Sequence, residues 1–457
     1  MATPAPLRRT SPPDLAPERP VVWPPRTSRT LANGMHVVLV ESHVIPKVTF
    51  ELYFRSGNAV TAHTSPGLAE ITSAVVRTGT RHRTSRQLEE DLRRMGADLS
   101  TNASSDSSHI AAAGLAEFAR PLLELIDDLA RNASFPAEEF ERERRQKIEE
   151  VKLERTTPGF LAGERLRKVL FGAHPYAVVS PSEAQVESWR REQLEEFYAA
   201  HYVPSNALLV AVGDFAAATM LKEIENVFGA WQAPQAPTVT YAEPPALRGR
   251  RVHFVHFPGS VQTQITMGNH AITRTHPDWM RLSLANAIFG GAFNSRLIAN
   301  IREQKGYTYS PRSSANALRD RGFFTVGAAV RTDVVAASLT EIFYELDRMR
   351  ALPVSDEELA DARNYLSGTF SLGLATQDGL AGQLATVLLH GLPEDYLETY
   401  RERMRALTAD DVLAAARRYF DSANAQMVVV GDREAVEEQA ALFGEVEVVD
   451  AHGAALE

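Results

Sequence analysis

Glu70, Ser73 and Ala74 stand at helical spacing i, i+3 and i+4 in the segment PGLAEITSAVVRTGT, residues 66–80. A helix would place all three on one face. In the motif His-x-x-Glu-His, this spacing lets two imidazoles hold Zn²⁺ while the glutamate takes a proton from metal-bound water. Here glutamate and alanine stand at the imidazole positions and serine stands at the base position. Alanine has no lone pair and serine is a poor base near neutral pH, so we expect no catalytic site of this kind in the chain.

Further carboxylates lie on a predicted helix at 137–155, which Ser134 and Pro136 introduce. Glu143 and Glu150 are two helical turns apart and share a face, and Glu149 is their neighbour. Catalytic zinc usually takes three protein ligands that include imidazole. Carboxylates such as these would at most hold a hard cation weakly, through several waters. We therefore expect no metal in this chain and interpret Glu143 and Glu150 as solvated helix charges.

Other catalytic centres find no support in the sequence. The thirteen histidines form no His-x-x-Glu or His-x-x-x-His pattern. His253 and His256 belong to the alternating segment VHFVHF, which predicts a strand whose side chains at these positions point to opposite faces. The chain has no cysteine and no G-x-S-x-G motif, which excludes thiolate zinc sites, catalytic thiols and that type of serine nucleophile.

Composition describes an ordinary globular protein of 457 residues, 44% hydrophobic and 23% charged, large enough for two to four domains. A net charge of −10 without a basic stripe argues against nucleic-acid or anionic-membrane partners. No stretch approaches eighteen apolar residues, so we expect no membrane span. Residues 1–26 are Pro-rich and lack an apolar core, which predicts a disordered or extended arm instead of a signal peptide. The cytoplasm is the expected location.

An internal repeat is the strongest sign of domain organisation. YVPSNALLVAVGD at 202–214 matches FDSANAQMVVVGD at 420–432, an offset of 218 residues. Each copy predicts a buried strand that ends in a Gly-Asp turn. Strand-like segments near the start of each half correspond as well, at 35–40, 48–54, 252–257 and 263–267. We infer two tandem copies of one α+β domain.

The predicted boundaries follow from composition. They are an arm at 1–26, a first domain at 27–235, a Pro-rich linker at 236–248, a second domain at 249–446 and a tail at 447–457. Thr84 and Gln87 form a capping box for a helix that ends at Met95, with Gly96 after it, and a second helix starts at Thr408. Within each domain the order of elements favours a mostly antiparallel sheet with helices packed on one face.

Two sets of residues carry a family resemblance. One is the pair of flanks around the first motif, Gly67-Leu68-Ala69 and Arg77-Thr78-Gly79-Thr80. The other is HPDWMRLSLANAIFGGAFNSRLIANIREQKGYTYSPRSS at 276–314. Both are similar to segments of the M16 peptidases (the pitrilysin or mitochondrial processing peptidase family), and the resemblance extends over both domains. It implies the M16/LuxS-like metallohydrolase fold, with the family's third metal ligand falling on Glu150 or Glu149.

The resemblance also implies a role. In the two-chain subfamily, a zinc-bearing subunit with an intact His-x-x-Glu-His motif pairs with a metal-less one, and the two enclose a chamber that cuts unfolded or extended peptides. The metal-less subunit contributes an Arg and Tyr pair that binds substrate. The best matches here are Arg302 and Tyr309, with Arg296 and Tyr307 as neighbouring candidates. This chain would then be a non-catalytic subunit without a cofactor of its own, and the zinc would lie in its partner.

Alternatives remain at this point. Arg302 is also compatible with an ion pair to Glu303 at a helix end, and Tyr309 with a residue packed in a strand. The chain would also fit a structural, scaffold-type M16 protein without a role in proteolysis, or a divergent metallopeptidase active alone through Glu70. Gly290 and Gly291 predict a loop that permits tight packing. Substrate would add as an extra strand to a sheet edge that the sequence does not identify.

Overall fold

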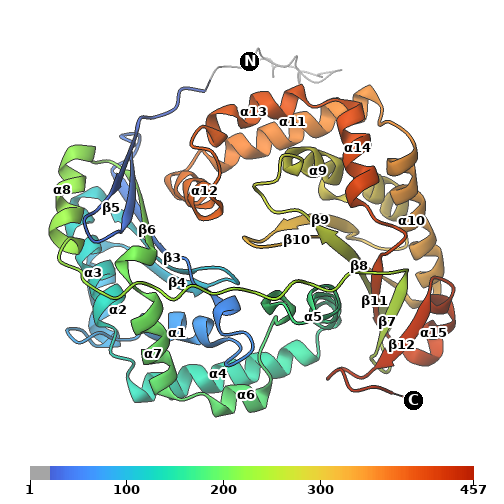
Figure 1. Cartoon of the computed structure of the whole chain (residues 1–457), viewed down its shortest axis with the longest axis horizontal. Helices are drawn as coiled ribbons and strands as arrows, with labels where there is room; N and C mark the ends of the chain where they lie inside the picture. The colour runs from blue at the N-terminus through green and yellow to red at the C-terminus, as the bar shows by residue number, and fades with distance from the viewer. Residues whose placement is uncertain (1–20, 457) are drawn as a thin grey trace, which may run out of the picture.

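The computed structural model describes residues 21–456 and shows two six-stranded sheets, one from each half of the chain (Figure 1). The first has the order β1-β2-β6-β3-β5-β4, from Arg26–Thr30, His36–Glu41, Ala207–Gly213, Lys47–Phe54, Ser108–Leu115 and Asp98–Ala103. The second has the order β12-β7-β11-β8-β10-β9, from Glu445–Val449, Arg251–His256, Gln426–Gly431, Gln262–Ala271, Gly322–Arg331 and Arg312–Ala317. The predicted α+β class with two homologous halves is confirmed.

The two sheets share one strand order apart from one edge strand. The repeated segments form β6 and β11, and each is parallel to one neighbour and antiparallel to the other. Most other pairs are antiparallel, as predicted. The edge strands differ because β1 comes from the start of the chain and β12 from its end. Residues 1–20 of the predicted arm lie outside the described residues, and the predicted boundary at 446 falls inside β12.

The repeated Gly-Asp turn has a structural reason in both halves. A Cβ on Gly213 would lie 2.5 Å from the carbonyl oxygen of Lys47 on the neighbouring strand, so only glycine fits there. Asp214 Oδ1 lies 2.6 Å from His43 Nδ1 in the β2–β3 loop. In the second half, Gly259 donates its backbone N–H to Asp432 Oδ2 at 2.7 Å. Each aspartate therefore holds the loop that connects the two strands on either side of its own strand.

Helices cover the sheets on both faces. In the first half they are α1 (Leu68–Val76), α2 (Ser85–Met95), α3 (Ala119–Asn132), α4 (Ala137–Arg155), α5 (Pro158–Phe171), α6 (Glu183–Ser188), α7 (Arg191–His201) and α8 (Ala217–Phe228). In the second half they are α9 (Trp279–Asn286), α10 (Val335–Ala351), α11 (Asp356–Gly373), α12 (Gln377–His390), α13 (Tyr396–Ala406), α14 (Ala409–Tyr419) and α15 (Arg433–Ala441). The predicted helix at 137–155 and the capping box of Thr84 with Gln87 are confirmed.

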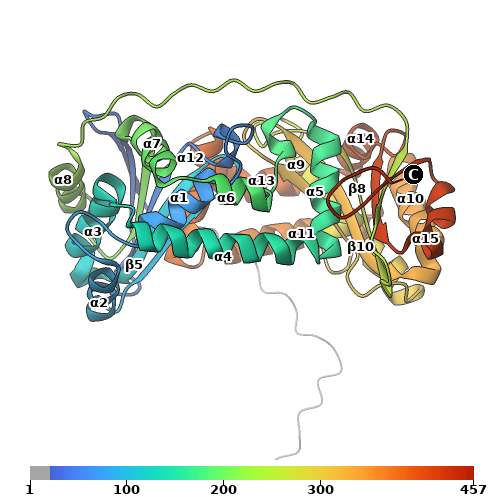
Figure 2. The ribbon, with the colours of Figure 1, turned by 90° about the horizontal axis from the view of Figure 1, so that it is seen from below.

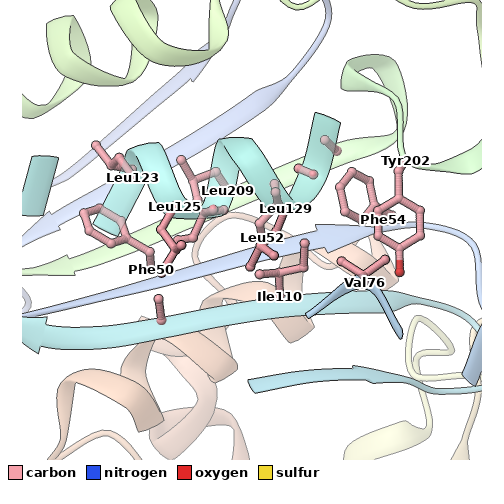
Figure 3. Packing of buried hydrophobic residues seen from close by; sticks show 14 of the residues in the cluster. Phe50, Leu52, Phe54, Val76, Ile110, Leu123, Leu125, Leu129, Tyr202 and Leu209 are labelled. Carbon is pink, nitrogen blue, oxygen red and sulfur yellow. The ribbon is translucent and has the colours of Figure 1, made fainter. Parts of the chain in front are cut away.

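The core of the first half lies between its sheet and its own helices (Figure 3). Alternate residues of β3, including Phe50 and Leu52, point to this face because side chains along a strand alternate between faces. They meet Leu123 and Leu129 of the amphipathic helix α3, and all four are fully buried. This packing places α1 beside the sheet, close to the edge strand β4.

The opposite face of each sheet is covered by a helix from the other half (Figure 1). Helix α5 packs on the second sheet, where Leu166 belongs to one buried cluster with Val428 and Val430 of β11. Helix α12 packs on the first sheet, where Leu384 belongs to a cluster with β2 and β6. The sequence predicts helices on one face of each sheet but does not predict this exchange. In the sequence, α5 and α12 each lie among the helices of their own half, so nothing local indicates that they pack on the other sheet.

The tips of two hairpins also join the halves. They are residues 104–107 between β4 and β5, and residues 318–321 between β9 and β10. Arg319 donates its backbone N–H to Asp106 Oδ2 at 2.9 Å, and Tyr176 donates its hydroxyl to Asp106 Oδ1 at 2.5 Å. Hence the edge strands β4 and β9 lead to one meeting point between the sheets.

The linker has neither helix nor strand between Gly229 and Arg251, and it crosses from one half to the other along one side of the molecule (Figures 1 and 2). It is exposed for most of its length. Within residues 21–456, no helix is both long and apolar enough to cross a membrane.

Two π-helical turns, η5 (Ala287–Gly291) and η6 (Ile298–Gln304), follow α9. Arg296, between them, makes a bidentate ion pair with Glu358 of α11, at 2.6 Å from Nε and 3.0 Å from Nη2. The hydrogen bonds from Arg296 lower the pKa of Glu358 to about 2. This pair fastens the segment that carries η6 to α11.

We expect the exchanged helices to hold the halves together without the linker. Cleavage at a protease site inserted at Thr238, in the exposed linker, should leave both fragments in one particle, because α5 and α12 stay buried on the opposite sheets. Size-exclusion chromatography under native conditions measures this. Fragments that separate without denaturant would show that the linker, and not the exchange, joins the halves.

The Arg296–Glu358 pair should make stability depend on pH. Because folding lowers the pKa of Glu358 from 4.5 to about 2, the pair stabilises the fold fully above pH 4.5 and loses this effect as the pH falls toward 2. We expect Arg296→Met to lower the unfolding temperature by about 2–4 °C near neutral pH, and the deficit to shrink by about pH 3. Thermal unfolding monitored by circular dichroism measures both. A deficit that is equal at both pH values, as expected only for lost packing, would contradict this.

Candidate functional site

Helix α1 carries the three positions of the altered metal motif. Its first residue follows Gly67, whose φ of 76° and close approach to Trp189 and Pro181 require glycine. Ser73 is buried, and its Oγ lies 3.0 Å from the hydroxyl of Tyr202. Ala74, which is partly exposed, adds only a methyl group. Ser73 thus serves the packing of α1, and Ala74 offers no ligand atom.

Glu70 points to α4, where it meets a lysine. Glu70 Oε1 lies 2.9 Å from the Nζ atom of Lys147, and Glu150 Oε2 lies 3.2 Å from the same nitrogen. The side chain of Lys147 is only 10% exposed. Burial works against its charge, yet the attraction of Glu70 and then Glu150 outweighs burial and raises the pKa of Lys147.

The other carboxylates have partners of their own. Glu143 accepts a hydrogen bond from Arg142 at 2.9 Å, and Glu149 lies in an exposed pair with Lys152 at 2.8 Å. Within residues 21–456, no three His, Cys, Asp or Glu side chains are grouped so as to hold a metal ion. The donor set of Glu70, Ser73 and Ala74, with an ammonium group between the carboxylates, does not fit catalytic zinc.

Sequence reasoning missed Lys147, although it lies on the helix face that Glu143 and Glu150 share. It follows Glu143 by four residues and precedes Glu150 by three. That spacing alone predicts ion pairs within α4. The contact with Glu70, on another helix, is decided by the packing of α1 against α4.

A second cluster lies in the other half and contains Arg302 and Tyr309. Arg302 belongs to the last turn of η6, and Tyr309 lies in the loop before β9. The guanidinium carbon is 4.4 Å from the ring centre of Tyr309 and 5.2 Å from that of Phe293. Both rings are on the surface, with Tyr309 79% and Phe293 71% exposed. Phe293 was not among the predicted site residues. Its position shortly after Gly290-Gly291 is the only local feature of the sequence that could have pointed to it.

The contacts of Arg302 include the helix-end ion pair that the sequence also allowed. Its Nε atom lies 3.2 Å from Glu303 Oε1, so an ion pair at the helix end does form. Tyr309, in contrast, does not pack in a strand, because β9 starts at Arg312 and the ring is exposed. The guanidinium carbon of Arg302 lies over the Tyr309 ring, a cation–π contact, and the Arg302 side chain is 23% exposed.

The neighbouring candidates hold this cluster in place. Arg296 is engaged by Glu358, and Tyr307 packs partly buried against the core of the second half. Gly290 lies in η5 instead of the predicted loop, because the chain continues from α9 into a π-helical turn. A Cβ on Gly290 would lie 2.7 Å from both Leu297 and the hydroxyl of Ser313, so tight packing is indeed the reason for glycine here.

The two strand histidines have separate structural partners. His253 Nδ1 lies 2.9 Å from Glu447 Oε2 on β12, and His256 Nδ1 accepts the backbone N–H of Arg433 at 3.2 Å. They belong to β7, where their odd spacing puts them on opposite faces. They form no joint site.

Two solved structures share this fold. The peptidase M16 inactive domain from Pseudomonas fluorescens superposes with a TM-score of 0.84 and 26% identity, covering 89% of this chain and 98% of that one. A protease from Helicobacter pylori gives a TM-score of 0.84 at 20% identity, covering 89% and 100%. The second likeness concerns the fold alone.

Sequence relatives cover nearly the whole chain. An uncharacterized zinc protease of Bacillus subtilis is 22% identical over 394 residues, which are 86% of this chain and 95% of that protein. A probable mitochondrial-processing peptidase subunit beta of Arabidopsis thaliana is 22% identical over 445 residues, which are 93% and 82%. Family models match in both halves, the insulinase or M16 peptidase model at residues 36–174 and the M16 inactive domain model at residues 188–366. With two matching models, the same sheet order in both halves and an altered metal motif, this chain belongs to the M16 peptidase family.

Proposed function

We propose that this chain is the non-catalytic subunit of a two-chain M16 zinc peptidase, in which it forms half of the peptide chamber and supplies Arg302 and Tyr309 beside the zinc of its partner. The observation that carries the proposal is a contrast within the chain. The metal motif is replaced by a packed Ser73 and an ion-paired Glu70, whereas the guanidinium of the partly exposed Arg302 lies over the ring of the exposed Tyr309. One relative, the Arabidopsis protein, is itself named as a subunit of a processing peptidase.

Arg302 and Tyr309 have the chemistry that such a role requires. A guanidinium and a phenol each donate hydrogen bonds to a peptide carbonyl oxygen, and they bind it more strongly when the carbonyl becomes a tetrahedral oxyanion. These donors need no metal of their own. The water that attacks the carbonyl would be activated at the partner's zinc, held by an intact His-x-x-Glu-His motif. In this chain Ser73 stands at the position of the glutamate base, and serine is a poor base near neutral pH.

The sheet edges offer a place for the peptide backbone. β4 and β9 are edge strands in corresponding positions, and most of their side chains are polar, with neither proline nor lysine and with one charged residue at the start of each, Asp98 and Arg312. Ser100 and Asn102 of β4 correspond to Ser314 and Asn316 of β9. Past its first residue, each edge can accept an added strand through backbone hydrogen bonds, which suits unfolded or extended peptides of varied sequence. A location in the cytoplasm remains a prediction.

Reconstitution tests this function. The purified chain should hydrolyse no unfolded peptide by itself, and hydrolysis should appear when an M16 subunit with the intact zinc motif is added. In the mixture, Arg302→Ala and Tyr309→Phe should each lower kcat by about 10²–10³-fold, the loss typical for one oxyanion donor. Fluorogenic peptide assays with matched subunit concentrations measure this.

The surface variant Arg86→Ala serves as a matched control. Arg86 is 88% exposed on α2, in the other half of the chain from η6, so this variant should leave kcat unchanged. If Arg302→Ala and Tyr309→Phe behave like this control while the complex still forms, the chain is a scaffold. Activity of the isolated chain that a chelator and Glu70→Ala both abolish would instead show a divergent enzyme, and either result would overturn the proposal.

A further inference from the structure

We propose that Lys147 takes the place of the metal ion, so that its ammonium group fastens α1 to α4 and keeps divalent cations out of the altered site. The inference concerns the first half of the chain alone. It stands whether or not the chain pairs with a zinc-bearing subunit, because it uses neither Arg302 nor Tyr309.

The position of the ammonium group supports this role. In the family frame, the first metal ligand falls on Glu70 and the third on Glu150 or Glu149. Lys147 Nζ lies within hydrogen-bond distance of Glu70, at 2.9 Å, and 3.2 Å from Glu150. One cationic atom thus joins the same two helices, α1 and α4, that a metal ion held by these positions would join.

Burial sets this ion pair apart from the others on α4. The Lys147 side chain is 10% exposed, whereas Lys152 and Glu149, paired at 2.8 Å on the same helix, are 49% and 72% exposed. Burying an ammonium group is costly unless an opposite charge replaces its lost hydration. Lys147 therefore depends on Glu70 and Glu150, whereas the two carboxylates, 39% and 52% exposed, stay partly hydrated.

The same charge excludes metal. A divalent ion that approached Glu70 and Glu150 would lie within a few ångströms of the ammonium group and would be repelled at short range. It would also have to displace Lys147 from both carboxylates. The replacement of His by Glu at position 70 fits this arrangement, since a neutral imidazole would leave the buried ammonium with Glu150 alone.

A double-mutant cycle tests the structural part. Lys147→Met should lower the unfolding temperature by about 2–4 °C or more, because Glu70 loses its partner. Adding Glu70→Gln to Lys147→Met should cost nothing further or restore stability, although Glu70→Gln alone destabilises the chain. The matched cycle on the exposed pair, Lys152→Met with Glu149→Gln, should show no coupling. Equal coupling in both cycles, or none in the first, would overturn the proposal.

Zinc binding tests the exclusion. The triple variant Glu70→His, Ser73→Glu, Ala74→His restores the motif but retains Lys147, and the quadruple variant adds Lys147→Ala. After equilibration with equimolar ZnCl₂ and gel filtration, we expect the quadruple variant to retain at least about tenfold more zinc than the triple variant. Circular dichroism first establishes that both variants are folded. Stoichiometric zinc in the triple variant, or equal zinc in the triple and quadruple variants, would show that Lys147 does not exclude metal from the site.

Discussion

Each of the two sheets in this protein has two apolar faces, and its own half of the chain supplies helices for only one of them. The second face is buried by a helix from the other half, α5 on the second sheet and α12 on the first. Neither half can bury its sheet completely without the other, so the exchange is the constraint on which the arrangement of the molecule depends. The hairpin contact of Asp106 with Arg319 adds hydrogen bonds at the junction, but the burial of apolar surface supplies the larger driving force.

The two halves use one topology for different purposes. In the first half, the helix that follows β3, α1, carries a metal motif reduced to packing and an ion pair. In the second half, the corresponding stretch after α9 continues into two π-helical turns that place Arg302 at the surface. π-helical turns often occur at functional sites, because one extra residue in a turn re-aims the side chains that follow. The second half thus presents the hydrogen-bond donors Arg302 and Tyr309, whereas the first half has lost its metal ligands. This contrast is the physical basis of the proposed non-catalytic role.

The nearly buried charge of Lys147 distinguishes this altered site from one that has merely lost its metal ligands. Random replacement of metal ligands would leave carboxylates facing each other, and they would repel one another or become hydrated. Here Glu70 and Glu150 face a nearly buried ammonium group. Ser73 likewise has a partner in the hydroxyl of the fully buried Tyr202. The altered motif is therefore an integrated part of the core of the first half.

The sequence by itself determined the features that rest on neighbouring residues. Hydrophobic patterns and caps predicted α4 and the capping box of Thr84, and the repeat at offset 218 predicted two like domains with β6 and β11 in equivalent places. The residue types at positions 70, 73 and 74 predicted the loss of the usual zinc chemistry. Only the tertiary structure decided where α5 and α12 pack, that Lys147 meets Glu70 across 77 residues, and that Arg302 stacks between Phe293 and Tyr309. The physical reason is that helix and strand patterns depend on side chains a few residues apart, whereas these contacts depend on which apolar faces pack together, and one sequence does not specify that pairing.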